Sequence, residues 1–313
     1  MMDLRIRLML WASRRKFGDF DPAITIERFR KAYVKTNEQF GLPDEGGVGL
    51  EDVRVPIDSG SILARFYRPA AIASPAPALL YFHGGGFSIG DVPSYDHLCR
   101  FFARVGNLVV VSIDYRLGPE FRFPHAHEDA FAALGWLQTH ATSFGIDPER
   151  IAVGGDSAGG NLAAALSALA TERGLKRPAY QYLIYPSVDA AHAYPSAQTH
   201  VKRLPLTPAQ MAYFSKQYAN SPSDGDSFLL SPLRAPHPEN LPPTYLLAAK
   251  YDPLAGEGKA YADRLAVAGV DVTYDLASTL PHAFVNLAGA VPRARKVLER
   301  SIRTVSGALR SPS

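Results

Sequence analysis

The feature that most constrains this chain is a Gly-x-Ser-x-Gly sequence between a strand pattern and a helix pattern. Residues 151–154 form a short apolar run, Gly155, Ser157 and Gly159 follow, and an alanine-rich stretch continues to about residue 173. A serine on a strained turn at this junction stands exposed above a sheet, where the helix N-terminus favours developing negative charge. We therefore expect Ser157 at positive φ, with no room for a Cβ at either glycine. The alternative is a glycine-rich turn with a bystander serine.

A serine nucleophile needs a histidine base and a carboxylate that orients it, in the chain order serine, acid, histidine. His282 is the last of nine histidines and follows a strand pattern at 271–276. Asp252 directly follows the buried strand pattern at 244–249. A lone Asp-Pro pair is more often a turn, and a lone loop histidine is more often a surface residue. The order of both residues and their placement at strand ends favour a catalytic triad of Ser157, Asp252 and His282.

Three glycines after the buried strand pattern at 79–82 predict an oxyanion hole. Gly84, Gly85 and Gly86 let the backbone approach a substrate without side-chain obstruction. The backbone N–H groups of this loop and of Ala158 are the expected donors to the oxyanion. A phosphate-binding loop is disfavoured, because neither a Lys-Ser/Thr pair nor a Gly-x-Gly-x-x-Gly spacing is present.

Taken together, these motifs resemble the hormone-sensitive-lipase family of esterases, in its bacterial family IV form with a Gly-Asp-Ser-Ala-Gly elbow, within the α/β-hydrolase superfamily. The resemblance covers roughly residues 45–310 and rests on the motifs at residues 83–86, 114–120, 155–160, 252–254 and 282–284. The family usually has Ala where Gly118 stands, an acidic residue where Gly256 stands, and Gly where Ala283 stands. None of these departures removes a catalytic group.

The resemblance implies an α/β-hydrolase fold: a mostly parallel eight-stranded sheet flanked by helices, with a helical cap. Residues 1–45 then form N-terminal cap helices, and residues 46–313 form the catalytic domain, with a second cap insertion at about 187–228. Apolar patterns predict strands at 50–57, 62–67, 79–82, 108–113, 151–154, 180–185, 244–249 and 271–277. Helix patterns lie at 95–105, 126–141, 208–219, 256–268 and 292–309.

Several polar and aromatic residues near the motifs have two readings. Arg116 could hold the floor of the active site, but we favour a structural role, as a buried ion pair or a carbonyl clamp that fixes the oxyanion loop. Asp156 should brace the elbow or a partner in the oxyanion loop, and His83 should fix the glycine loop by hydrogen bonds. Glu257 could assist near Asp252, but an exposed helix-start carboxylate is favoured. Four further residues either line the acyl pocket or pack the cap: Phe87, Met211, Tyr213 and Phe214.

Composition limits the classes of function. The chain has 313 residues, is 47% hydrophobic and carries a formal net charge of +3, with no basic stripe that would indicate a nucleic-acid partner. Cys99 is the single cysteine, so no intrachain disulfide forms. The N-terminal apolar run is too short for a secretory signal, and no run reaches the length of a membrane span, which favours a cytoplasmic enzyme.

The sequence therefore predicts a serine carboxylesterase that hydrolyses short- to medium-chain esters without a cofactor or metal. An amidase, lactonase or acyltransferase on the same triad stays open, because residue spacing does not separate these reactions. A non-catalytic ligand-binding relative, such as the plant gibberellin receptors, is disfavoured because His282 is present. The strand at 271–277 is a candidate sheet edge for a homodimer.

Overall fold

One mixed sheet forms the centre of the computed structural model, which describes residues 1–192, 194–198 and 205–310. Within these residues the sheet has eight strands in the order β1-β2-β4-β3-β5-β6-β7-β8. Strand β2 runs antiparallel to β1 and β4, and the other neighbours are parallel. The strands are β1 Val48–Ile57, β2 Gly60–Pro69, β3 Ala76–Phe82, β4 Val109–Asp114, β5 Ile146–Asp156, β6 Tyr180–Ile184, β7 Thr244–Tyr251 and β8 Val272–Pro281. The predicted mostly parallel eight-stranded sheet is confirmed.

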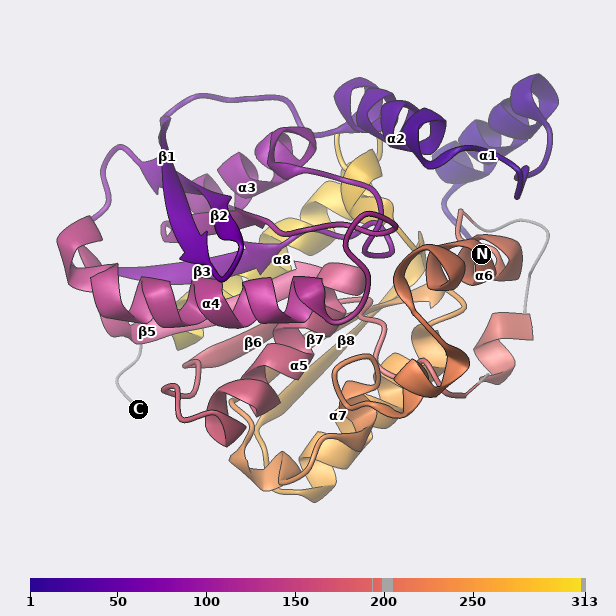
Figure 1. Cartoon of the computed structure of the whole chain (residues 1–313). Helices are drawn as coiled ribbons and strands as arrows, with labels where there is room; N and C mark the ends of the chain where they lie inside the picture. Colours follow the sequence, from indigo (N-terminus) through magenta and orange to yellow (C-terminus); the bar gives the residue numbers. More distant parts are fainter. Residues whose placement is uncertain (193, 199–204, 311–313) are drawn as a thin grey trace.

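Helices cover both faces of this sheet (Figure 1). Helices α4 (His125–His140), α5 (Ala158–Glu172) and α7 (Ala255–Val267) pack on one face, and α3 (Val92–Gly106) and α8 (Pro292–Ala308) pack on the other. Strand β3 shows why both faces are apolar. Leu80 and Phe82 enter the core under α4 and α5, while Leu79 and Tyr81 enter the core under α3 and α8. A strand buried on both sides reads as a continuous apolar run, because its side chains alternate between two cores.

Three further helices gather on one side of the molecule, beyond the end of the sheet (Figure 1). They are α1 (Leu4–Phe17), α2 (Ile26–Phe40) and α6 (Pro208–Tyr218). They occur in the segments predicted as cap, 1–45 and 187–228, of which residues 193 and 199–204 lie outside the described residues. Short 3₁₀ helices span Ala141–Phe144, Pro195–Gln198, Pro222–Asp226, Pro232–Arg234, Pro238–Asn240 and Phe284–Leu287. None of the helices in the described ranges combines the length and apolar character that crossing a membrane requires.

Local capping decides where two of these helices begin. The Asp91 side chain accepts the N–H of Ser94, whose hydroxyl accepts the N–H of Asp91, so α3 begins at Val92 rather than at residue 95. Thr207 and Gln210 form the same reciprocal pair at the start of α6. A capping box satisfies donors that the first helical turn leaves unpaired, and periodicity alone does not detect it.

A buried ion pair joins the end of β4 to α4. The Asp129 carboxylate accepts hydrogen bonds from the Arg116 backbone N–H at 2.8 Å, from Nε at 3.0 Å and from Nη2 at 2.6 Å. Asp129 is almost completely buried and the Arg116 side chain is mostly so. This confirms the ion pair predicted for Arg116, although its Nη1 donates to the Ser59 hydroxyl and not to the glycine loop.

Replacing Asp129 by Asn should lower the free energy of unfolding by about 2 to 4 kcal/mol, because the Arg116 charge loses its buried partner. The matched control is Glu128→Gln on the same helix, whose partner Arg173 is half-exposed. This change should cost less than about 1 kcal/mol. Urea denaturation followed by circular dichroism measures both values, and equal losses in the two variants would show that burial of the Arg116–Asp129 pair does not matter.

Candidate active site

The turn between β5 and α5 has the strained geometry expected of an elbow. Ser157 adopts φ 55° and ψ −116° at the N-terminus of α5. A Cβ at Gly155 or Gly159 would overlap the carbonyl oxygen of Phe82 in the neighbouring strand β3. The absence of both side chains therefore allows the turn to pack directly on the sheet, as the sequence predicts.

Ser157, His282 and Asp252 come together from the C-terminal ends of three strands. The Ser157 Oγ lies 2.9 Å from His282 Nε2, and His282 Nδ1 lies 2.7 Å from Asp252 Oδ2. The other carboxylate oxygen of Asp252 accepts the Leu254 N–H at 2.8 Å. The ring of Tyr185 packs on the imidazole with centroids 4.5 Å apart. Asp252 and His282 are both buried, so packing as well as hydrogen bonds limits the orientations of their side chains.

The glycine loop after β3 lies beside the elbow. Gly85 has φ 119° and Gly86 has φ 57°, conformations that favour glycine. No N–H of these two residues donates to another atom of the described residues. The Gly84 N–H, by contrast, donates to the Asp156 carboxylate at 2.9 Å. Gly84 therefore differs from the prediction for the oxyanion hole, because its donor is already engaged inside the protein.

His83 holds the start of this loop, as the sequence predicts. Its Nδ1 lies 2.8 Å from the Gly84 carbonyl oxygen, and its ring stacks on Tyr115 with centroids 4.4 Å apart. The Tyr115 hydroxyl donates to the His83 carbonyl at 2.7 Å. These contacts fix the backbone on the strand side of the loop.

Asp156 is a buried carboxylate between the elbow and the glycine loop. The Tyr81 hydroxyl donates to Oδ1 at 2.8 Å, and the Tyr95 hydroxyl donates to Oδ2 at 3.1 Å. Burial raises the pKa of Asp156, and the donors from Tyr81, Tyr95 and Gly84 oppose that rise. Asp156 thus braces both the elbow and the loop, the two roles that the sequence left open.

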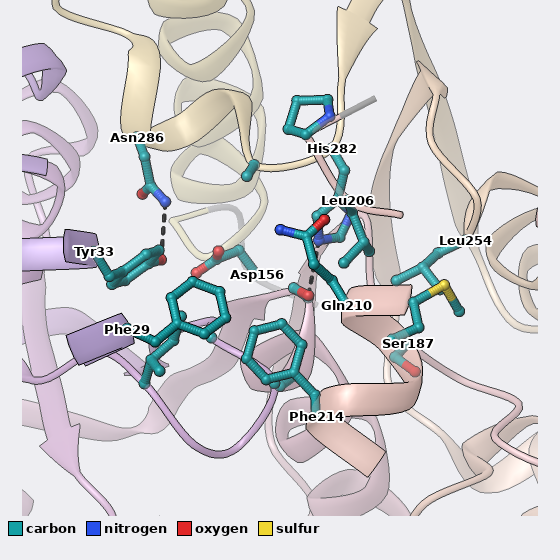
Figure 2. A pocket seen from close by; sticks show the side chains of 18 of the residues that line it. Phe29, Tyr33, Asp156, Ser187, Leu206, Gln210, Phe214, Leu254, His282 and Asn286 are labelled. Atoms are coloured by element: carbon teal, nitrogen blue, oxygen red, sulfur yellow. Dashed lines mark hydrogen bonds between the residues drawn. The ribbon is translucent and has the colours of Figure 1, made fainter. Parts of the chain in front are cut away.

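A hydrogen-bonded chain continues from Asp156 into α2. The Tyr95 hydroxyl lies 2.7 Å from the Tyr33 hydroxyl, which accepts a hydrogen bond from Asn286 Nδ2 at 2.8 Å. Figure 2 shows Tyr33 and Asn286 joined by this hydrogen bond on one side of the cavity, with Asp156 nearby. No sequence pattern indicated this link, because Tyr33 is one aromatic residue among several on an amphipathic helix.

Arg30, also on α2, clamps the segments next to the glycine loop. Its Nε donates to the Ser88 carbonyl at 2.9 Å and its Nη2 donates to the Gly118 carbonyl at 2.9 Å. Both terminal nitrogens also donate to the Glu120 carboxylate at 2.7 Å. The carbonyl clamp that we assigned to Arg116 is therefore formed by Arg30. The sequence pointed to this clamp only through Glu120, the partner of Arg30, which is the last residue of the motif at 114–120.

A cavity of about 1170 Å³ opens above Ser157 and runs between α1, α2 and α6. Its wall includes Phe87, Met211 and Phe214, three of the four predicted pocket residues. Figure 2 shows Phe29, Phe214, Leu206 and Leu254 around this space. Tyr213 does not line it, because its ring packs on Phe20 and Phe29 and its hydroxyl donates to the Ile24 carbonyl. The prediction of Tyr213 on the pocket wall is wrong.

Glu257 also differs from its prediction as an exposed helix-start carboxylate. It is buried beside the cavity, and its carboxylate accepts the Val188 N–H at 2.8 Å. Burial, together with the nearby charges of Asp252 and Asp189, raises the pKa of Glu257 to about 8. In the described part of the chain, no group of three His, Cys, Asp or Glu side chains is placed to hold a metal ion.

Sequence comparison agrees with this geometry. A family model described as the alpha/beta hydrolase fold matches residues 79–286. Esterase LipI of Mycobacterium tuberculosis is 39% identical over 259 residues, covering 80% of this chain and 79% of LipI. Ethyl acetate hydrolase of Pseudomonas putida is 36% identical over 299 residues, covering 93% of this chain and 94% of that protein.

Solved structures agree as well. An esterase of the archaeon Pyrobaculum calidifontis superposes with a TM-score of 0.92 at 35% identity, covering 98% of each chain. A thermostable esterase of Pseudomonas putida gives a TM-score of 0.94 at 28% identity, covering 99% of this chain and 98% of that one. Fold, site geometry and relatives point the same way: the chain belongs to the hormone-sensitive-lipase family of α/β-hydrolase esterases.

Proposed function

We propose that this protein is a serine carboxylesterase in which Ser157 is the nucleophile, His282 the base and Asp252 the acid of a catalytic triad. The observation that carries the proposal is the continuous hydrogen-bonded path from Ser157 Oγ through the imidazole to Asp252 Oδ2. The Ser157 end of this path lies at the floor of a cavity that is large enough for an organic ester. The names of the relatives, esterases and carboxylic ester hydrolases, support the same reaction class.

In this mechanism Ser157 Oγ attacks the ester carbonyl carbon while His282 Nε2 takes the hydroxyl proton. Asp252 holds the imidazole in the tautomer that presents Nε2 as acceptor, and stabilises the imidazolium. The C–O bond to the alcohol then breaks, and His282 returns the proton to the leaving alkoxide. Water repeats the sequence on the acyl-enzyme and releases the acid.

The developing oxyanion would be held by the backbone N–H groups of Gly85, Gly86 and Ala158. Gly85 and Gly86 lie on the loop side of the serine, and Ala158 is the first residue of α5. An N–H in the first helical turn has no intrahelical partner and lies at the positive end of the helix dipole. Donors of this kind contribute most of the transition-state stabilisation in acyl transfer.

We propose short- to medium-chain acyl groups as substrates. The ring of Phe214 lies directly over Gly86 and stacks on Phe29 with centroids 5.4 Å apart, which crowds the space above the oxyanion loop. An amidase, lactonase or acyltransferase would use the same triad and is the alternative. A matched ester and amide of one acid separates these reactions, because amide cleavage demands stronger protonation of the leaving group.

Three wider expectations belong to the same proposal. The helices of residues 1–45 and of the insertion at 187–228 would act as a cap over the cavity, which α1, α2 and α6 line. We expect the protein to act in the cytoplasm. Strand β8 is one of the two outer strands of the sheet, and a second copy pairing along it would give a homodimer.

Ser157→Ala should abolish hydrolysis of p-nitrophenyl esters while the protein stays folded, because the Ser157 hydroxyl is the group hydrogen-bonded to His282 Nε2. The measurement is initial rates with acyl chains from acetate to palmitate, for wild type and variant side by side. A maximum at short or medium chains, absent in the variant, is the expected result. Retention of most activity by the purified variant would rule out Ser157 as the nucleophile.

Asp252→Asn separates the proposed acid from its neighbour Asp189. The substitution should reduce kcat by roughly 10⁴-fold, because the amide stabilises the wrong imidazole tautomer. Asp189→Asn is the matched control, since this carboxylate is also buried at the cavity but accepts from the Tyr194 hydroxyl. It should stay within about tenfold of wild type. The reverse ranking would transfer the role of acid to Asp189.

Arg30→Gln should lower kcat by roughly 10- to 100-fold with a smaller change in KM, because a slightly displaced oxyanion loop weakens transition-state binding. Arg28→Gln, an exposed change on the same helix, is the control and should have no effect. Steady-state kinetics with p-nitrophenyl butyrate gives both constants. Equal kcat values in the two variants would show that the clamp does not position the loop.

Glu257 gives a pH-dependent contribution to stability. Its folded pKa of about 8 lies above the ordinary carboxyl value, so the unfolded chain loses this proton first as pH rises. The contribution is therefore lost progressively between about pH 4.5 and pH 8. Glu257→Gln should flatten the decline of unfolding free energy across this window. Urea titrations at several pH values test this, and an unchanged slope would contradict a raised pKa.

A further inference from the structure

Helix α1 exposes a row of large apolar side chains that no part of the described structure covers. Leu4 is 63% exposed, Leu8 57% and Trp11 59%, and Met1 just before the helix is 88% exposed. Leu4, Leu8 and Trp11 are spaced by four and three residues, so they lie along one side of the helix. Isolated exposed apolar residues are common, but a contiguous row on one helix marks an interaction surface.

The opposite side of α1 packs on the protein and lines the cavity. Ile6 is buried in the core beneath α3 and α8, and Met9, Leu10 and Ser13 line the cavity above Ser157. The helix is therefore apolar on two sides, and only one of them packs on the protein. Figure 1 shows α1 at the periphery of the molecule, beside α2 and with free space on its outer side.

The flanks of the exposed row are strongly basic. Helix α1 contains Arg5, Arg7, Arg14, Arg15 and Lys16 and no acidic residue. At 100° per residue, Arg7 and Arg14 fall on one side of the row and Arg5 and Lys16 on the other. The guanidinium of Arg15 lies 5.4 Å from the centre of the Trp11 ring. Long cationic side chains beside a Trp-containing apolar strip suit the boundary between lipid headgroups and acyl chains.

We propose that α1 is an interfacial helix that binds the surface of an anionic lipid bilayer, with Leu4, Leu8 and Trp11 inserted at the headgroup boundary. Charge decides between a bilayer and a second copy of the chain as the occupant of this face. In a two-fold contact the same basic patch would face itself, and the arginines of the two copies would repel each other. An anionic lipid surface supplies the opposite charge around the apolar row.

This orientation would place the cavity next to the lipid. Met9 and Leu10 line the cavity, and they are next in sequence to Leu8 and Trp11 of the exposed row. A lipophilic ester dissolved in the bilayer would then reach Ser157 without crossing bulk water. This delivery step rests on the proposed esterase function, whereas the binding of α1 to lipid does not.

Vesicle sedimentation tests the binding itself. We expect the wild-type protein to sediment with vesicles of phosphatidylglycerol and phosphatidylcholine in equal parts at low salt, and to bind pure phosphatidylcholine much more weakly. Leu8→Gln/Trp11→Gln should reduce partitioning by roughly tenfold or more, because two buried apolar side chains are lost. Val267→Gln on α7, a residue 90% exposed in wild type, is the matched control and should bind like wild type.

The charge contribution has its own test. Arg7→Gln/Arg15→Gln should weaken binding to the anionic vesicles roughly fivefold for each charge removed. Added salt should weaken wild-type binding in the same direction, because it screens the attraction. A blue shift of tryptophan fluorescence on adding vesicles, lost in the Leu8→Gln/Trp11→Gln variant, would place Trp11 in the lipid.

Three results would overturn the proposal. The first is no binding of the wild type to anionic vesicles at low salt, and the second is equal binding by the wild type and the Leu8→Gln/Trp11→Gln variant. The third is a wild-type dimer, seen in sedimentation velocity, that dissociates in this variant. The last result would assign the face to a second copy. Hydrolysis of p-nitrophenyl butyrate without vesicles should be unchanged in all these variants, since none of the substituted residues lines the cavity. An inactive wild type that still binds vesicles would contradict the proposed function and leave the lipid surface in place.

Discussion

The buried carboxylate of Asp156 is the constraint on which the rest of the site depends. A carboxylate removed from water needs hydrogen-bond donors, and here they come from β3, α3 and the glycine loop. Because Asp156 immediately precedes Ser157, the same donors that satisfy the charge also fix the elbow relative to the loop. The serine and the candidate oxyanion donors therefore form one rigid unit rather than two segments that must be aligned by a substrate.

Helix α2 is attached to this unit at two points. Tyr33 enters the hydrogen-bonded chain that ends at Asp156, and Arg30 holds the carbonyls of Ser88 and Gly118. Gly118 in turn donates its N–H to the Phe87 carbonyl within the glycine loop. Movement of α2 would strain both connections at once, so the N-terminal segment is part of the site architecture and not a detachable cover.

The sequence predicted what depends on local sterics and chain order. The strands, the elbow and the serine, acid, histidine order follow from runs of apolar residues and from glycines, and the structure brings these three side chains within hydrogen-bond distance. Arg30 and Tyr33 were missed because their partners lie far along the chain. The glycine at position 118 is explained only by the folded structure, because a Cβ there would overlap the carbonyl oxygen of Gln217 in α6. Ala283 adopts φ 60°, which explains the glycine that the family usually has there.

Two carboxylates at the candidate site, Asp252 and Glu257, differ in their surroundings, and that difference supports the role proposed for Asp252. Asp252 accepts hydrogen bonds from the Leu254 N–H and from the imidazole, so its charge is compensated from two sides. Glu257 is buried, accepts a hydrogen bond from the Val188 N–H, and lies near the charges of Asp252 and Asp189. Burial and the nearby charges of Asp252 and Asp189 raise the pKa of Glu257, which favours the protonated form of this carboxyl. In the proposed mechanism the developing imidazolium therefore faces Asp252, which touches the imidazole, whereas Glu257 lies outside this hydrogen-bonded path.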